Sequence, residues 1–535
     1  MKKSNLILLA ILILAIVLRF WQLGQVPTIL NRDEAALAYN ALLLKETGKD
    51  EWSRRWPVIL ESFGDDKLIG YPLTLIGSFF LFGYSDWAVK LPAAIAGVVL
   101  VWLAYLWAKN IFRWETKWAL CLSLLVALQP VLFFFSRIAF EANLALALFV
   151  ASLLLLFNQQ IQTVKWRLLS DIVAGFLLLA AVFIYNTPLL LLPFFIPLVT
   201  WWRGIKKPKL WFPAVLVIMT VILIGGTTLL SLSQQKSGIT IFSDEDTWFA
   251  FVKYHDSFSG LTQKVVGNKV AFYGQIIAQH YWQTLGPVFL VERGGTHPWH
   301  QLPGWGHLFW ITYLLGLVGI LAALINLIKI FWQKKWAKLS ENQNKLSLLL
   351  LAFLLVTPLP AAITVDAPHA TRSLFFFVVW LMWSVIGLQL LFTWAQKYLP
   401  KFSKLVIGIF LFILFVESAN YYFHYFRDYP AESTAILRGN FAPALTQITS
   451  DQKVQKAAII DDGGYQYILA AWYLKMSPNT FFATVQKQLP DKIGFRYGYK
   501  LGKFRFIKQP EDRFKDEKTL LEWDSSLLQW IRKDL

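Results

Sequence analysis

Long apolar segments separated by short polar ones occupy the first 425 residues of the chain. A helix of about 20 apolar residues crosses the ~30 Å hydrocarbon core of a membrane, and about eleven segments approach that length. The pattern therefore predicts a polytopic α-helical membrane protein. The segments lie roughly at 5–23, 88–112, 117–135, 138–158, 168–186, 187–202, 210–230, 305–331, 346–364, 373–395 and 404–423.

Lys and Arg residues gather in alternate turns between these segments. If the N-terminus is cytoplasmic, the clusters at 109–117, 165–167, 203–209, 329–338 and 397–404 all fall on the cytoplasmic side. Cytoplasmic loops of membrane proteins carry an excess of basic residues, which is known as the positive-inside rule, and this count of spans agrees with it. We therefore expect a multi-pass protein of the cell membrane, with a cytoplasmic N-terminus and an extracytoplasmic C-terminus.

The outer side receives two long loops, 24–87 and 231–304. In the first loop, apolar residues recur at helical spacing from Ala35 to Leu44, which predicts an amphipathic helix lying in the membrane surface. The apolar stretch 68–83 is interrupted by Gly70, Pro72 and Gly77, and predicts a second interfacial helix.

Residues 426–535 form no spanning segment and differ in composition from the rest. KAAIID (456–461) has the character of a buried strand and YQYILAAWYLKM (465–476) that of an amphipathic helix. FRFI (504–507) predicts another strand, and TLLEWDSSLLQWIRK (519–533) another helix. We expect a transmembrane domain at 1–425 and a small extracytoplasmic α/β domain at 426–535.

Composition narrows the class of protein further. The 535 residues are 56% hydrophobic and carry a formal net charge of +18. Membrane orientation accounts for the basic clusters, so we expect no nucleic-acid partner. A single cysteine, Cys121, excludes an intramolecular disulfide and a cysteine metal cluster.

Asp33 and Glu34 follow directly after the first span. Adjacent carboxylates beside a low-dielectric layer are costly, which makes them candidates for catalysis. The alternative is that the acidic pair only opens a helix, since acids favour the first turn.

Several segments resemble the GT-C glycosyltransferases that use lipid-linked sugars, in particular bacterial relatives of the protein O-mannosyltransferases and the lipid A aminoarabinose transferases. The segments are RDEAALAYNALLLKETGKDEW and FGDDKLIGYPLTLIGSFFLFGYSDWAVKLPAAIAGV in the first loop, then SRIAFEANLALAL, YNTPLLLLP and PHATRSLFFF. This resemblance covers roughly residues 1–425. Where relatives often carry Lys-Pro-Pro, this chain has Lys67-Leu68-Ile69.

The resemblance implies a GT-C fold and an inverting transfer of a sugar from a polyprenyl-phosphate donor to a hydroxyl of a protein, lipid or glycan acceptor at the outer face. It implies Asp33 as general base, and we expect Glu34 beside it to orient the acceptor or to assist. The departing phosphate needs cations at the outer surface. The candidates are Lys67, Arg372 and Arg137, although lone basic residues there often only anchor the helix, and Glu141 is placed to pair with Arg137.

Further polar residues are candidates for substrate contacts, namely Tyr71, Asp366, His369, His297 and His300. The His-x-x-His spacing of His297 and His300 can reach a metal ion, but the further ligands cannot be placed from sequence. Contacts to acceptor or sugar are favoured over a divalent metal, and no metal ligands are assigned.

Two other functions remain open. A transporter or flippase for lipid-linked sugars would show ionisable residues in the middle of its spans, whereas spans such as 88–108 and 346–364 lack them. A ligase-like or polymerase-like enzyme would carry its main catalytic loop late in the chain, and the acidic pair after the first span argues against it.

Overall fold

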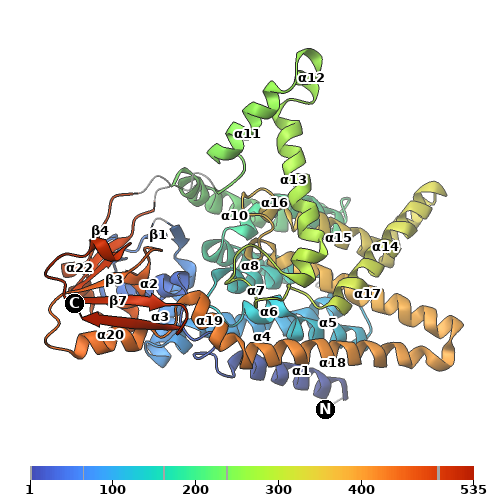
Figure 1. Cartoon of the computed structure of the whole chain (residues 1–535). Helices are drawn as coiled ribbons and strands as arrows, with labels where there is room; N and C mark the ends of the chain where they lie inside the picture. The colour runs from blue at the N-terminus through green and yellow to red at the C-terminus, as the bar shows by residue number, and fades with distance from the viewer. Residues whose placement is uncertain (1–2, 64, 161–162, 236–238, 491–494, 535) are drawn as a thin grey trace.

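The computed structural model describes residues 3–63, 65–160, 163–235, 239–490 and 495–534. It is a bundle of apolar helices with a small sheet at one end, and the hairpins α14–α15 and α17–α18 extend away from that sheet (Figure 1). Eight helical stretches in the described residues are long and apolar enough to cross a membrane. They contain α1 (Lys3–Phe20), α4 (Asp86–Asn110), α8 (Val164–Ile184), α10 (Pro208–Gln235), α14 (Trp310–Trp332), α15 with α16 (Asn342–Val356, Leu359–Ala362), η3 with α17 (Thr371–Ser373, Leu374–Tyr398) and η4 with α18 (Pro400–Phe402, Ser403–Arg427).

Three more predicted spans are present as shorter apolar helices: α5 (Thr116–Leu128), α7 (Glu141–Phe157) and α9 (Thr187–Arg203). The predicted span 117–135 is divided because Pro130 cannot continue the hydrogen bonding of α5 and starts α6 (Pro130–Phe134) instead. The prediction of a polytopic helical membrane protein is confirmed.

The centre of the bundle is α17, which is buried along most of its length and packs closely against α14. Glycines allow this approach: a Cβ atom added at Gly387 would lie 2.0 Å from the carbonyl oxygen of Leu315. Small residues at a helix–helix contact let two backbones come together in a membrane.

The first long loop contains α2 (Arg32–Thr47), the hairpin of β1 (Ile59–Ser62) and β2 (Asp65–Leu68), and α3 (Gly70–Phe82). Both predicted helices are present. However, α2 is buried from Asp33 to Leu44 and packs against α21 (Gln466–Tyr473) of the C-terminal region, rather than lying open at the surface. The C-terminal region covers the apolar residues of α2. The Tyr39 hydroxyl of α2 also donates a hydrogen bond to the Met476 carbonyl of this region at 2.9 Å.

The second long loop forms a helical arm of α11 (Glu245–Asp256), α12 (Gly260–Val265) and α13 (Lys269–Leu285). The arm projects away from the bundle (Figure 1). It returns through η1 (Val288–Glu292) to the body, and the following loop leads into α14. On the side opposite the sheet, η2 (Trp336–Ser340) connects α14 to α15.

The C-terminal region contains a six-stranded sheet in the order β4-β5-β6-β3-β7-β8. The central β3 (Ala457–Ile460) runs parallel to β6 (Phe504–Ile507) and β7 (Thr519–Asp524), whereas the outer strands pair antiparallel. The remaining elements are α19 (Tyr429–Leu437), α20 (Phe441–Ser450), α22 (Pro478–Thr484), β4 (Gln486–Lys487), β5 (Gly498–Leu501), η5 (Pro510–Asp512) and β8 (Gln529–Asp534).

The predicted strands at 456–461 and 504–507 and the helix near 465–476 are confirmed. The predicted helix at 519–533 is wrong, because these residues form the hairpin β7–β8. Asp524 fixes its turn by accepting hydrogen bonds from the backbone amides of Ser526 and Leu527 at 2.8 and 3.0 Å. Side chains of this type favour turns over helix interiors.

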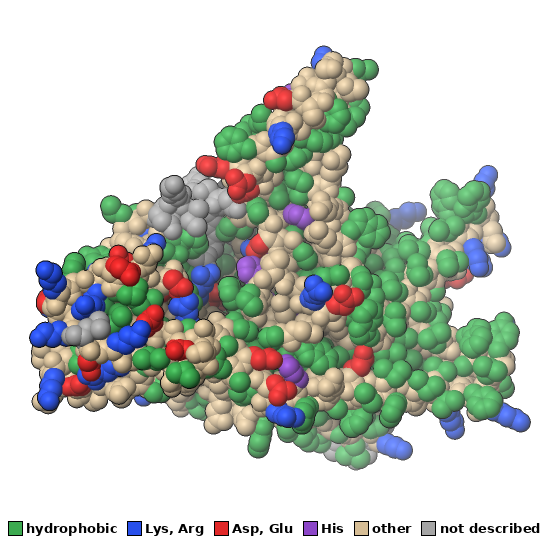
Figure 2. All heavy atoms as spheres, in the orientation of Figure 1, with side chains coloured by type: hydrophobic (Ala, Val, Ile, Leu, Met, Phe, Trp, Pro, Cys, Tyr) green, Lys and Arg blue, Asp and Glu red, His purple; other side chains and the backbone are tan. Residues whose placement is uncertain are grey.

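Polar and apolar surfaces separate clearly in Figure 2. Acidic and basic side chains gather on the left, over the C-terminal sheet, and hydrophobic side chains dominate the right, over the spanning helices. An apolar surface of this extent is typical of a protein surrounded by lipid.

Asp461, at the end of β3, is buried, and its carboxylate accepts hydrogen bonds from the amides of Gly464 (2.7 Å) and Gln466 (2.9 Å). Burial raises its pKa to about 6. The folded state therefore binds this proton more tightly than the unfolded state, and the stability contributed by Asp461 is present below about pH 4 and lost as the pH rises to about 6.

We expect Asp461→Asn, which cannot ionise, to gain stability relative to the wild type by about 2–3 kcal/mol between pH 4 and pH 7. Thermal unfolding of both proteins across this range measures the difference. A constant difference in melting temperature would contradict the raised pKa. Asp516→Asn, at an exposed position, is the matched control, since Asp516 pairs only at the surface with Lys456.

Candidate active site

The acidic pair opens α2, as one of the two interpretations of the sequence states. Asn31 caps the helix by accepting hydrogen bonds from the amides of Asp33 (2.8 Å) and Glu34 (3.0 Å). Glu34 completes a capping box through its contact with the Asn31 amide at 3.0 Å. The two carboxylates then have different positions.

Glu34 is fully buried, and its other carboxylate oxygen accepts a hydrogen bond from the Ala139 amide at 2.6 Å. Burial raises the pKa of Glu34, against the nearby Lys90 charge and the two backbone hydrogen bonds. Both oxygens of Glu34 are thus used to hold the backbone of two segments together. Glu34 does not line the cavity described below, so the predicted assisting role in catalysis has no support in its position.

Asp33 points the other way. Lys67 Nζ lies 2.9 Å from Asp33 Oδ1, and the β1–β2 hairpin positions Lys67 opposite Leu60. The departure from Lys-Pro-Pro is therefore compatible with a strand, in which Lys67 and Leu68 both take part in the pairing with β1. Asp33 and Lys67 form a carboxylate–ammonium pair at the edge of a large cavity.

A second polar cluster lies on another wall of the same cavity, at the turn before η3. Arg372 Nη1 contacts Asp366 Oδ1, and His297 Nε2 lies 3.2 Å from Asp366 Oδ2. His369 Nε2 lies 3.4 Å from the same oxygen. The ring of His300 lies 4.9 Å from the rings of His297 and His369, centre to centre.

The charges of this cluster follow from its surroundings. Burial lowers the pKa values of His300 and His369 well below 6.5, and neighbouring imidazoles and Arg372 lower them further. Burial by itself raises the pKa of Asp366, but the hydrogen bond from His297 and the Arg372 charge outweigh it and hold the pKa well below its usual range. The cluster thus combines the Asp366 carboxylate and the Arg372 guanidinium with the neutral imidazoles of His300 and His369.

The cavity has a volume of about 410 Å³, within the range of small-molecule sites. It brings together residues from the first loop, the second loop and the turn before α17. Predicted site residues in its lining are Asp33, Lys67, His297, His300, Asp366, His369 and Arg372.

Other lining residues were not predicted as site residues. Arg32, Tyr185, Asn186, Trp299 and Glu141 also line the cavity. Tyr185 and Asn186 belong to the YNTP segment, and Glu141 to the SRIAFEAN segment, so the motifs contained a signal for three of them. Arg32 could have been found from its position beside Asp33. Its guanidinium lies 5.7 Å from the ring centres of Phe63 and Trp299.

Two predicted site residues, Tyr71 and Arg137, lie outside the cavity lining and form hydrogen bonds within the protein instead. Tyr71 is fully buried, and its hydroxyl donates to the Val89 carbonyl at 3.2 Å. Arg137 is also fully buried and closes the C-terminus of α1, where carbonyl groups lack partners within the helix. Its guanidinium donates to the carbonyls of Leu18 (2.9 Å), Arg19 (3.1 Å), Trp21 (2.7 Å), Gln22 (3.1 Å) and Val26 (3.3 Å), and to the Tyr425 hydroxyl (3.0 Å).

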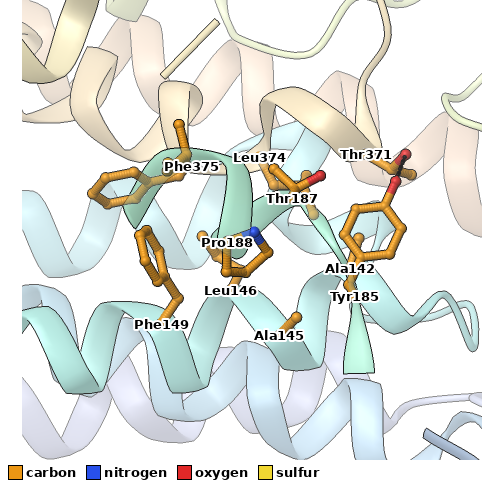
Figure 3. Close-up of a pocket in the computed structure, with 11 residues that line it drawn as sticks. Ala142, Ala145, Leu146, Phe149, Tyr185, Thr187, Pro188, Thr371, Leu374 and Phe375 are labelled. Carbon is orange, nitrogen blue, oxygen red and sulfur yellow. Dashed lines mark hydrogen bonds between the residues drawn. The ribbon is translucent and has the colours of Figure 1, made fainter. Parts of the chain in front are cut away.

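A small apolar pocket of about 20 Å³ adjoins the cavity and shares Tyr185, Thr187 and Thr371 with it. In Figure 3, Tyr185 and Thr371 lie at one end, joined by a hydrogen bond of 2.9 Å. Pro188, Leu146, Phe149, Leu374 and Phe375 line the remainder. The polar cavity thus continues into an apolar seam between α7, α9 and α17.

One set of side chains in the cavity could hold a metal ion. His297, Asp366 and His369 each offer one ligand atom, and the three atoms lie within 4.8 Å of one another. His297 and His300, the pair that the sequence spacing singles out, are thus not the set that the structure favours for a metal.

Comparison with known proteins shows which family model and which solved structures this chain resembles. Residues 66–224 match the family model described as dolichyl-phosphate-mannose-protein mannosyltransferase. No curated protein matches the sequence. ArnT from Cupriavidus metallidurans, solved with bound undecaprenyl phosphate, is similar in structure with a TM-score of 0.50 and 11% identity, over 89% of this chain and 85% of that one.

The oligosaccharyltransferase of Archaeoglobus fulgidus in its apo form has a TM-score of 0.50 and 12% identity, over 89% of this chain. The present chain spans only 64% of the length of that archaeal protein. The archaeal oligosaccharyltransferase AglB from Archaeoglobus fulgidus, in complex with an inhibitory peptide and a dolichol-phosphate, matches with a TM-score of 0.47 and 11% identity, over 88% of this chain and 63% of that one. The protein is therefore a multi-pass membrane protein with the GT-C glycosyltransferase fold, and it resembles the dolichyl-phosphate-mannose-protein mannosyltransferase family over residues 66–224.

Proposed function

We propose that this protein is a glycosyltransferase that moves a sugar from a polyprenyl-phosphate donor to a hydroxyl group at the outer face of the membrane. The observation that carries the proposal is the cavity in which the carboxylate of Asp33 and the cations of Lys67 and Arg372 share one lining. Transfer from a lipid phosphate needs a base for the acceptor and cations for the departing phosphate. ArnT, a structure of the same fold, binds undecaprenyl phosphate.

The proposed reaction is a single displacement at the anomeric carbon. Asp33 takes the proton of the acceptor hydroxyl, the acceptor oxygen forms the new bond to the anomeric carbon, and the bond from that carbon to the phosphate oxygen breaks. The polyprenyl phosphate leaves with both electrons of that bond. Attack from the face opposite the leaving group inverts the anomeric configuration. Glu34 has no part in this proposal, since its oxygens are bound to backbone amides.

The cations act on the departing phosphate. Arg372 presents a planar guanidinium that suits the geometry of a phosphate, and it is already oriented by Asp366. Lys67 pairs with Asp33 at 2.9 Å. A donor phosphate that draws the ammonium toward itself would free the Asp33 carboxylate for the acceptor proton, so donor binding and activation of the base are coupled through Lys67.

The polyprenyl chain needs an apolar path from the phosphate into the membrane. We propose that the chain leaves the cavity where the apolar seam between α7, α9 and α17 begins, at Tyr185 and Thr371 (Figure 3). The pocket in this seam measures only about 20 Å³, so the helices have to move apart for an isoprene unit to enter. This placement puts the donor phosphate beside Arg372 and the sugar toward Asp33. We also propose that the cavity lies at the outer face, with the basic turns in the cytoplasm and residues 426–535 as an outer domain that covers α2, because basic residues favour the cytoplasmic side.

A flippase for lipid-linked sugars is the alternative, and the positions of the charges favour the transferase. Asp33, Lys67, Asp366 and Arg372 lie in the outer loop or at helix ends, and all line one cavity. Transporters instead place their substrate site near the bilayer midplane, at interrupted helices.

The test uses the purified full-length protein in nanodiscs, with radiolabelled polyprenyl-phosphate sugars and lysed-envelope fractions as acceptors. We expect label to move to an acceptor and free polyprenyl phosphate to appear in equal amount. Donor binding with no transfer to any acceptor class, together with movement of intact donor across sealed vesicles, would favour the flippase and overturn the proposal.

A further inference from the structure

Three side chains from two separate outer segments meet on the wall of the cavity. His297 belongs to the loop between η1 and α14, whereas Asp366 and His369 belong to the turn between α16 and η3. Their ligand atoms lie within 4.8 Å of one another. A cluster of two imidazoles and a carboxylate is a common donor set for a divalent transition metal with an open coordination position.

Two of the three distances between ligand atoms in the cluster fit such an ion, and the third is at most 4.8 Å. In tetrahedral zinc sites the bonds to His nitrogen and carboxylate oxygen are about 2.0–2.2 Å, so neighbouring ligand atoms lie about 3.3–3.5 Å apart. Here Asp366 Oδ2 lies 3.2 Å from His297 Nε2 and 3.4 Å from His369 Nε2. Two edges of the tetrahedron are thus close to their required lengths, and both imidazoles approach one carboxylate oxygen.

The surrounding contacts orient the three ligands. Nδ1 of His369 lies 3.0 Å from the Thr371 hydroxyl, which in turn lies 2.9 Å from the Tyr185 hydroxyl. This contact turns Nε2 of His369 toward Asp366. The other oxygen of Asp366 contacts Arg372. Metal-binding imidazoles and carboxylates are typically held by hydrogen bonds through the atom that does not bind the metal, so both contacts are of the expected kind.

We propose that His297, Asp366 and His369 bind a divalent metal ion of the zinc class, with the fourth position open to the cavity. Imidazole nitrogens exclude Mg²⁺ and Ca²⁺ as the preferred ions, since these take oxygen ligands. The fourth position faces the space that also contains Arg372. The ion and the guanidinium would therefore both bind the phosphate group of the donor. That role rests on the proposed function; the binding of the ion does not.

The test measures Zn²⁺ binding to the full-length protein in detergent, first stripped of metal by a chelator. We expect saturable binding of one Zn²⁺ per chain by calorimetry and by elemental analysis after dialysis. The double variant His297→Ala/His369→Ala should bind Zn²⁺ at least tenfold more weakly. His255→Ala is the matched control, because His255 lies on the arm and contacts the Gly267 carbonyl at 2.7 Å. We expect it to bind as the wild type does.

Melting temperatures separate loss of the site from loss of the fold. Zn²⁺ should raise the melting temperature of the wild type, since a ligand that binds only the folded state stabilises it. In the single variant His297→Ala, whose imidazole is partly exposed, this shift should be lost while the metal-free melting temperature is kept. Zn²⁺ binding that is unsaturable in the wild type, or unchanged in the double variant, would overturn the site.

A further experiment repeats the Zn²⁺ titration with undecaprenyl phosphate present. Tighter Zn²⁺ binding is expected if the lipid phosphate fills the fourth position, since coupling between two ligands is reciprocal. Unchanged affinity would overturn the contact between metal and phosphate. None of these titrations includes a sugar donor or an acceptor, so a negative result for the metal leaves the transferase proposal standing, and failed sugar transfer leaves the metal site standing.

Discussion

Asp33→Asn is expected to reduce sugar transfer by at least about 100-fold while donor binding is kept. General-base catalysis contributes on the order of 10²–10⁴-fold, and an amide cannot take the acceptor proton. The substitution keeps the size of the side chain, and it keeps the cap of α2, because Asp33 contributes to the cap through its backbone amide. Turnover at saturating donor and acceptor, compared with donor affinity, separates the base from a binding residue.

Asp516→Asn is the matched control, since it makes the same chemical change at an exposed residue of the C-terminal region. It should transfer sugar as the wild type does. Wild-type turnover in Asp33→Asn would rule out Asp33 as the base. A lower melting temperature in this variant would instead show that the pair with Lys67 stabilises the fold, so thermal unfolding belongs in the same experiment.

Arg372→Ala is expected to lower turnover by about 10²–10³-fold and, unlike Asp33→Asn, to weaken donor binding as well. Removing one preorganised donor to a developing negative charge costs about this much in other enzymes. Arg372→Lys should recover part of the activity, because Lys restores the charge without the planar fork. Photo-crosslinking or calorimetry with a polyprenyl-phosphate sugar measures the donor affinity of each variant.

Two further proteins complete this experiment. Arg427→Ala removes an equally charged but exposed residue near Asp428, and we expect unchanged donor binding. Lys67→Ala shows whether the two cations act on the same phosphate, since the effects of residues that share a ligand are not additive. Full donor affinity in Arg372→Ala would contradict the placement of the phosphate beside α17.

The contrast between Asp33 and Glu34 shows where sequence alone stops. Adjacent in the chain, the two carboxylates have the same local signals, and both were predicted to act in catalysis. Only the packing of α2 against the turn at Ala139 buries Glu34 and gives its oxygens to backbone amides, while Asp33 faces the cavity. Similarly, Arg137 and Arg372 were both predicted to bind the donor phosphate, but Arg137 is surrounded by the carbonyls that end α1.

The amino-acid sequence determined the features that depend on local physics. Apolar length determined the membrane class and most helix positions, and the acidic pair at Asp33 and Glu34 indicated where α2 begins. Tertiary structure alone decided that the first loop, the His297 loop and the turn at Asp366 share one cavity, and that residues 519–533 pair as strands. Local hydrophobic and capping energies act over a few residues, whereas the cavity joins residues as far apart in the chain as His297 and Asp366, and β7 is held as a strand by pairing with the distant β3, where Ala457 lies opposite Thr519. Such contacts depend on the packing of the whole bundle, which no local pattern specifies.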